Sequence, residues 1–185
     1  MLFRSVVNLF WHALDQGIFC LLDNPCYDLK MTDYSIIRGS LVIVANTGVL
    51  ITGEPGVGKS AAAINLALKG FCIVCDELVR IHRSAEGKII GEAVKCPAQI
   101  EVRGLGIFLL DDLFPELLRS ESGIDIIVEL ANFDGSLDLG RVTPEIDLVE
   151  IMGISVPRFR TPVTAGLAAH SLIELVVRLN RKSGF

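Results

Sequence analysis

Short apolar runs separated by turn-forming residues dominate the middle of the chain. Residues 48–52 are apolar and rich in β-branched side chains, which predicts a buried strand. Residues 61–69 consist mostly of alanine, leucine and isoleucine, and Gly70 follows as a C-terminal cap signal, so we expect a helix there. The apolar run at residues 71–75 predicts another strand. Together these runs predict a strand–helix–strand unit.

Further apolar runs on both sides of this unit predict more strands. They cover residues 41–44, 89–90, 100–103, 107–110, 124–130 and 148–152. Residues 156–163 contain Pro157 and Pro162, and because proline lacks a backbone N–H we expect an edge strand or an extended loop there. Many strands with few helices predict a mixed sheet rather than a regular doubly wound fold.

The last part of the chain predicts a terminal packing helix at residues 167–179. Its apolar stripe would consist of Leu172, Ile173, Val176 and Leu179. Before the strands, residues 1–35 are poorly patterned and are expected to form a divergent leader to a folded domain at residues 36–185. Polar and charged residues interrupt the apolar stretch at residues 1–22, which favours an amphipathic helix over a signal peptide.

The composition is that of one folded globular domain. The chain has 185 residues, of which 51% are hydrophobic and 21% charged, and this excludes disordered and fibrous classes. The net charge is −5 and the chain has no basic run, which argues against a nucleic-acid partner. No apolar stretch reaches the roughly 18 residues of a membrane-spanning helix. Without a targeting signal, we expect a cytoplasmic location.

Two of the five cysteines, Cys72 and Cys75, have the C-x-x-C spacing of some metal and redox sites. Both lie in the strand predicted at residues 71–75, where residues three apart point to opposite faces. The two sulfur atoms would therefore diverge, and we expect reduced thiols.

Residues 53–60 match the pattern G-x-x-x-x-G-K-[ST], placed between the predicted strand and helix. In such a loop, backbone N–H groups converge at a helix N-terminus and bind the phosphates of a nucleotide. Lys59 would contact the β- and γ-phosphates, and the Ser60 hydroxyl would hold Mg²⁺. The expected nucleotide-binding residues are Gly53, Glu54, Pro55, Gly56, Val57, Gly58, Lys59 and Ser60.

Acidic residues are needed to complete a Mg²⁺ site and to orient or deprotonate a nucleophile. Two pairs compete for these roles, Asp76-Glu77 after the second predicted strand and Asp111-Asp112 after a later apolar run. The pattern alone does not choose between them, and either can be a solvated turn. Glu101 is a third candidate, because a carboxylate on a strand beside a double-glycine turn is unusual for a plain solvated face.

The loop at residues 53–60, the Asp76-Glu77 pair and residues 101–107, which read EVRGLGI, resemble the catalytic domain of the HPr kinase/phosphorylase family. That family carries a P-loop, an Asp-Asp pair and the signature E-[IV]-R-G-[LV]-G-I. The resemblance covers residues 36–182. The chain is similar to the short, catalytic-core form found in α-proteobacteria. It implies an α/β fold with a P-loop kinase-type core, a mixed β-sheet and flanking helices, of the HPr kinase and PEP carboxykinase type.

The resemblance also implies roles for individual residues. ATP would bind at the loop, with Mg²⁺ held by Ser60, Glu101 and Asp76. Glu77 occupies the position of the family's catalytic aspartate, which accepts the proton of the target serine. Arg141 corresponds to a catalytic arginine that, together with Lys59, offsets charge on the transferring phosphoryl group. Under this alignment the Asp111-Asp112 pair has no counterpart.

Three departures from the family pattern are visible. Arg38 stands where the family usually has a histidine, and an arginine cannot serve as a base. Glu77 keeps the carboxylate but has a side chain that is one methylene longer. Where many members read P-V-x-P-G-R-N, residues 162–168 read PVTAGLA and lack the arginine. The family links that segment to dephosphorylation, so the kinase activity is favoured over the phosphorylase activity.

The sequence therefore favours an ATP- and Mg²⁺-dependent serine kinase acting on the phosphocarrier protein HPr or its nitrogen-pathway relative. One alternative is a nucleotide-binding regulatory module that transfers nothing, motivated by the departures at Arg38, Glu77 and Leu167. Another is a small-molecule kinase that uses the same loop. The resemblance also implies a homo-oligomer, which is a hexamer in the family.

Overall fold

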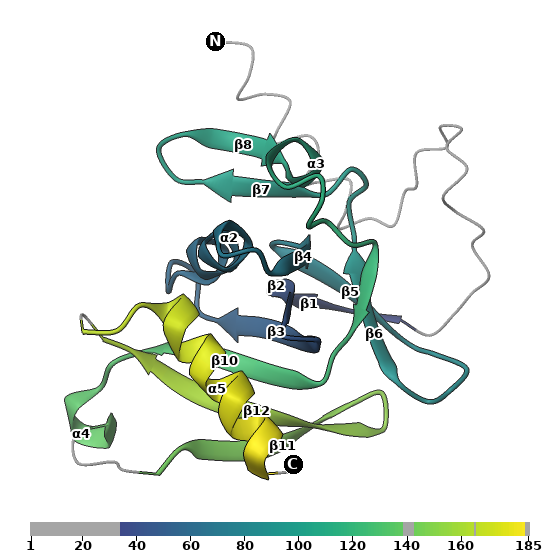
Figure 1. Cartoon of the computed structure of the whole chain (residues 1–185). Helices are drawn as coiled ribbons and strands as arrows, with labels where there is room; N and C mark the ends of the chain where they lie inside the picture. Colours follow the sequence, from purple (N-terminus) through teal and green to yellow (C-terminus); the bar gives the residue numbers. More distant parts are fainter. Residues whose placement is uncertain (1–33, 139–142, 165, 184–185) are drawn as a thin grey trace, which may run out of the picture. The chain divides into compact units, whose positions relative to one another are not determined.

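The computed structural model describes residues 34–138, 143–164 and 166–183 (Figure 1). The expected leader at residues 1–35 and the helix expected at 1–22 lie outside this part, except that residues 34 and 35 belong to the first strand. The strands are β1 (Tyr34–Arg38), β2 (Ser40–Val44), β3 (Thr47–Gly53), β4 (Cys72–Cys75), β5 (Leu78–Arg83), β6 (Ile89–Ala93), β7 (Gln99–Val102), β8 (Gly106–Leu109), β9 (Glu121–Gly123), β10 (Ile126–Asn132), β11 (Glu145–Ile151) and β12 (Ile154–Val163). The helices are α2 (Lys59–Leu68), α3 (Leu110–Leu113), α4 (Gly135–Asp138) and α5 (Ala169–Ser183).

The largest sheet has six strands in the order β11-β12-β10-β3-β2-β4. β10 runs parallel to both β3 and β12, whereas all other pairings in this sheet are antiparallel. The expected mixed sheet is therefore confirmed. A four-stranded antiparallel sheet has the order β1-β5-β6-β9, and β7 and β8 form a separate two-stranded sheet.

β2 lies between β3 and β4 and is antiparallel to both. β3 and β4 therefore run in the same direction and end at the same edge of the sheet, with α2 connecting them. The loop that follows β3 and the acidic residues that follow β4 meet at this edge because of that topology.

Two apolar clusters fill the space on either side of the six-stranded sheet. On one face, α2 and α5 pack over the sheet, as Figure 1 shows for α5 in front of β10 and β12. α2 contributes mainly small side chains to this cluster, namely Ala62, Ala63, Leu66 and Ala67. On the other face, strands of the four-stranded sheet supply Val79, Ile81 and Ile89 to a second cluster.

The end of α2 confirms the predicted stop at Gly70. Gly70 has a φ of 91°, and its N–H donates to the carbonyl oxygen of Ala67 at 2.8 Å. The N–H of Phe71 donates to the carbonyl oxygen of Leu66 at 3.1 Å. These two bonds form a Schellman motif, in which glycine adopts the left-handed conformation without strain from a Cβ atom.

The expectation of an edge strand or loop at residues 156–163 is wrong, because β12 lies between β11 and β10 inside the sheet. Pro157 is paired with β11 but precedes the first residue that pairs with β10, and Pro162 is paired with β10 but lies beyond the last residue that pairs with β11. Each proline thus has one side without a paired strand, the kind of position in which a sheet tolerates proline.

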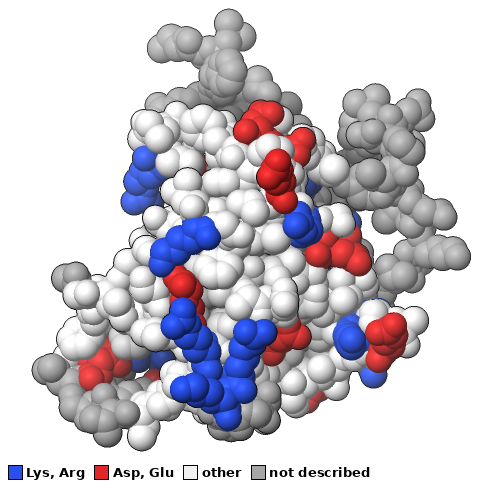
Figure 2. All heavy atoms as spheres, in the orientation of Figure 1, with Lys and Arg blue, Asp and Glu red and all other residues white. Residues whose placement is uncertain are grey.

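The terminal helix is confirmed as α5, but its predicted apolar stripe is only partly right. Ile173 and Val176 are buried, whereas Leu179 is 48% exposed. Val177 is buried instead, because the helix turns this flank toward the sheet. Figure 2 shows Lys and Arg side chains gathered over α5, whose last turn carries Arg181 and Lys182. Cations there complement the negative end of the helix dipole.

The strand predicted at residues 71–75 is confirmed as β4. Cys72 and Cys75 lie at the two ends of β4 and both are free thiols, with Cys75 buried and Cys72 only partly so. Among the described helices, none is long and apolar enough to cross a membrane.

Gly48 offers a test of the packing between β3 and β9. A Cβ atom at this position would lie 1.7 Å from the carbonyl oxygen of Gly123, so the two backbones could no longer approach. We expect Gly48→Ala to lower the free energy of unfolding by about 3 kcal/mol or more and the thermal midpoint by roughly 10 °C. Thermal unfolding followed by circular dichroism measures the change.

Gly123→Ala is the matched control, because its Cβ would lie 3.9 Å from the nearest atom, the carbonyl oxygen of Ile89. We expect this variant to stay within about 0.5 kcal/mol of the parent protein. Equal stability of the two variants would contradict the close approach.

Candidate functional site

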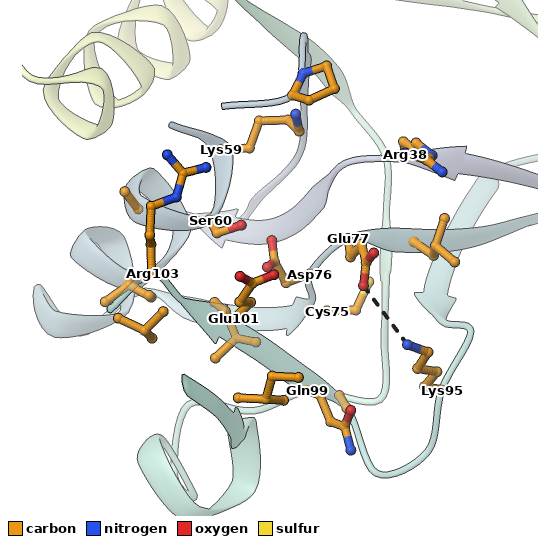
Figure 3. A pocket seen from close by; sticks show the side chains of 18 of the residues that line it. Arg38, Lys59, Ser60, Cys75, Asp76, Glu77, Lys95, Gln99, Glu101 and Arg103 are labelled. Carbon is orange, nitrogen blue, oxygen red and sulfur yellow. Dashed lines mark ion pairs between the residues drawn. The ribbon is translucent and has the colours of Figure 1, made fainter. Parts of the chain in front are cut away.

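A cavity of about 630 Å³ opens at the sheet edge where β3 and β4 end. Most of its walls come from the loop between β3 and α2, the residues that follow β4, and the β7 strand with its turn, and Arg38 of β1 and the connection between β6 and β7 complete the lining (Figure 3). Lys59 and Ser60 come from the first segment, Asp76 and Glu77 from the second, and Glu101 from the third. The structure therefore brings together acidic and basic candidates that lie far apart in the sequence.

The loop has the backbone that phosphate binding requires. Gly56 and Gly58 have φ values of 86° and 107°, in the region that favours glycine, and a Cβ at either position would meet no atom within 4 Å. α2 begins at Lys59 with Gly58 as its N-cap, and no side chain caps it. The N–H groups of a first helical turn have no intrahelical acceptor, so they remain available to an anion in the cavity.

Lys59 is held against its own loop. Its Nζ donates to the carbonyl oxygens of Gly53 at 2.8 Å and of Glu54 at 2.9 Å. Burial lowers the pKa of Lys59 below its ordinary value, the Asp76 carboxylate opposes this shift, and the Arg38 guanidinium adds to it. Both Asp76 and Arg38 thus act electrostatically on the loop lysine, as expected for groups that share one cavity.

Asp76 and Glu77 have different surroundings although they are adjacent. Asp76 accepts a hydrogen bond from the Ser40 hydroxyl at its Oδ1 atom, 2.5 Å away. Glu77 has a φ of 70°, which is unusual for a residue with a side chain, and its Oε2 atom lies 3.9 Å from Nζ of Lys95. The Glu77 side chain is 56% exposed, so this ion pair is a weak restraint.

The backbone turn between β1 and β2 fixes the position of Glu77. The N–H of Gly39 donates to the carbonyl oxygen of Glu77 at 3.1 Å. A Cβ atom at position 39 would lie 2.5 Å from the carbonyl oxygen of Ile51, so only glycine allows this turn to pass so close to β3.

Glu101 enters the cavity from β7, in a sheet separate from that of β4, the strand that precedes Asp76. In Figure 3 the carboxylates of Asp76 and Glu101 point toward each other beside the Ser60 hydroxyl. Within the described residues, no group of three or more His, Cys, Asp and Glu side chains could hold a metal ion on its own. Two carboxylates and a hydroxyl fit Mg²⁺, because this ion keeps several waters and binds phosphate oxygens as further ligands.

Other predicted residues fall outside the cavity. Glu54 and Val57 do not line it; Glu54 contributes its carbonyl oxygen to Lys59, and Val57 packs against the core. Asp111 and Asp112 lie exposed on α3 and do not line the cavity either. Arg141 lies outside the described residues.

Two residues that matter for the geometry were not predicted from the sequence. Ser40 begins an apolar run and carries no motif, so only the pairing of β2 with β4 shows that its hydroxyl meets Asp76. Lys95 lies in the connection between β6 and β7, and its approach to Glu77 depends on that fold as well.

The comparisons with known proteins bear on this arrangement. The family model for the HPr serine kinase C-terminal domain matches residues 29–184. The chain belongs to this family. A solved structure, the HPr(Ser) kinase/phosphatase from Coxiella burnetii, has a TM-score of 0.73 and 26% sequence identity, and the match covers 80% of this chain and 92% of that one.

Two curated relatives in the HPr kinase/phosphorylase family are longer than this chain. The protein from Geobacter sulfurreducens is 31% identical over 177 residues, which is 95% of this chain and 56% of the relative. The protein from Caldicellulosiruptor bescii is 34% identical over 147 residues, which is 78% of this chain and 47% of the relative. The chain thus spans about half the length of these curated relatives and is homologous to HPr kinase/phosphorylase enzymes.

Lys59 provides a test of the loop as a phosphate site. We expect Lys59→Met to weaken ATP binding by about 10- to 100-fold, because a charged hydrogen bond to phosphate contributes roughly 1.5–3 kcal/mol. Isothermal titration calorimetry measures the dissociation constant. Lys69→Met is the control, since Lys69 lies at the other end of α2 and pairs with Glu174. Similar affinities for the Lys59 variant and the parent protein would contradict this assignment.

Proposed function

We propose that this chain is an ATP- and Mg²⁺-dependent kinase that phosphorylates a serine of an HPr-type phosphocarrier protein. The observation that carries the proposal is the cavity in which a glycine-rich loop with Lys59 faces three carboxylates from two other segments. Membership in the HPr serine kinase family supports the choice of acceptor. Phosphoryl transfer depends on positioning and charge neutralisation, and this cavity holds groups for both.

Glu77 is the residue that would orient the acceptor serine and take its proton. Its carboxylate is exposed at the cavity, and its only ion pair among the described residues is the weak one with Lys95, so an incoming hydroxyl can displace that contact. A general base must come within hydrogen-bond distance of the proton that it removes. An exposed carboxylate on a backbone fixed through Gly39 meets this need better than Asp76, which Ser40 already engages.

The cations of the cavity would neutralise charge on the transferring group. Lys59 would contact the terminal phosphates, and Arg38 lies close enough to shift the pKa of Lys59. Ser60, Asp76 and Glu101 would hold Mg²⁺, which supplies charge neutralisation at the phosphate oxygens when bound. We assign Arg141 the same electrostatic role, from the resemblance alone.

Transfer to a carrier protein is the direct test of this proposal. The protein is incubated with ATP, Mg²⁺ and a purified HPr-type carrier, and phosphoserine is located by mass spectrometry of the carrier. We expect one phosphorylated serine. ATP binding without transfer to any cognate carrier would contradict the proposal and favour a regulatory module, whereas ATP consumption with a metabolite would favour a small-molecule kinase.

Glu77→Gln tests the proposed base. It keeps the size of the side chain but removes its ability to accept a proton, so we expect the rate of transfer to fall by about 100-fold or more. ATP binding should change little, because the Glu77 side chain is not part of the phosphate loop. Asp112→Asn is the control, since this exposed carboxylate on α3 does not line the cavity. Equal transfer rates for both variants would exclude Glu77 as the base.

A further inference from the structure

We propose that Ser40 is a positioning residue that orients the Asp76 carboxylate for binding of a magnesium–nucleotide complex. This inference rests on the proposed function only in taking Mg²⁺ and a nucleotide as the ligands of the cavity. Ser40 itself does not line the cavity; it would act through Asp76.

The position of Ser40 follows from the sheet. Ser40 is the first residue of β2 and pairs with Ile51 of β3, while the next residue, Leu41, pairs with Cys75 of β4. Ser40 therefore lies between the strand that enters the phosphate loop and the strand that Asp76 follows. Ser40 has no exposed surface, so its hydroxyl cannot form a hydrogen bond with bulk water.

The Ser40 hydroxyl donates a short hydrogen bond to Oδ1 of Asp76. The buried Ser40 hydroxyl thus occupies Oδ1 with a hydrogen bond. Oδ2 accepts no hydrogen bond from the described residues, and the carboxylate points toward Ser60 and Glu101 in Figure 3. The bond thus fixes which oxygen is left for a ligand.

Another buried hydroxyl in the same sheet has a different kind of hydrogen-bond partner. Thr161 on β12 is also buried, but its hydroxyl donates to the carbonyl oxygen of Phe159 in its own strand. Ser40 instead joins two strands through a carboxylate that lines the cavity. Partners of this kind orient metal ligands, and their loss typically costs 10–100-fold in metal affinity or activity.

The test separates metal-dependent from metal-independent binding. A non-hydrolysable ATP analogue is titrated by calorimetry into the full chain, once with EDTA and once with Mg²⁺, and the ratio of the two dissociation constants is the gain due to the metal. We expect Ser40→Ala to reduce this gain by about 10-fold while binding in EDTA stays within about twofold. Thr161→Val, which removes a buried hydroxyl away from the cavity, should leave both constants unchanged.

Two results would overturn the inference. One is an unchanged gain in folded Ser40→Ala; the other is an equal loss of binding with and without Mg²⁺, which would indicate a general distortion of the loop. If Ser40→Ala does not fold, Ser40→Cys replaces it, because a thiol is similar in size but a weak donor. The cysteine variant should also lose most of the gain, and retention of the full gain would overturn the inference.

The outcomes for Ser40 and for the proposed function are distinguishable. If the parent protein shows a metal-dependent gain that Ser40→Ala loses, but phosphorylates no carrier, then the inference stands and the proposed kinase activity fails. If the parent protein phosphorylates a carrier and Ser40→Ala keeps the full gain, then the kinase proposal stands and the inference fails. A parent protein without any metal-dependent gain contradicts the inference directly.

Discussion

The antiparallel pairing of β2 with both β3 and β4 is the constraint on which the site depends. It forces β3 and β4 to run in the same direction, so the phosphate loop and the acidic pair emerge at one edge of the sheet. The helix between them contributes alanines to the core, which lets it pack closely on the sheet while its N-terminus faces the cavity. The same strand pairing therefore determines the fold of this region and the groups that meet in the cavity.

Local sequence was sufficient for the elements of this region. The apolar run before the loop, the helix-forming residues after it and the glycine that stops the helix all gave the right elements, because each depends on short-range preferences. The phosphate loop was found for the same reason. The strand β5 was not predicted, although Val79 and Ile81 alternate with polar residues along it.

The choice between the two acidic pairs depends on the pairing of strands that lie far apart in the sequence. Nothing in the pattern distinguished Asp76-Glu77 from Asp111-Asp112, because the difference lies in which strand is a neighbour of β2. The cavity contains the first pair and not the second. The prolines of β12 led to the wrong prediction of an edge strand for the same reason. The free-energy cost of a proline in a sheet depends on where the neighbouring strands begin and end. A buried serine at the start of an apolar run gave no signal at all.

Asp76 follows β4 of the six-stranded sheet and Glu101 lies on β7, and these two sheets share no backbone ladder within the described residues. A ligand held by both would act as a cross-link between the main sheet and the β7–β8 hairpin. The turn of that hairpin carries Leu105, which is 76% exposed, and β8 carries Ile107, which is 69% exposed and lines the cavity. A ligand held by both carboxylates would therefore restrain the hairpin that carries these exposed apolar side chains.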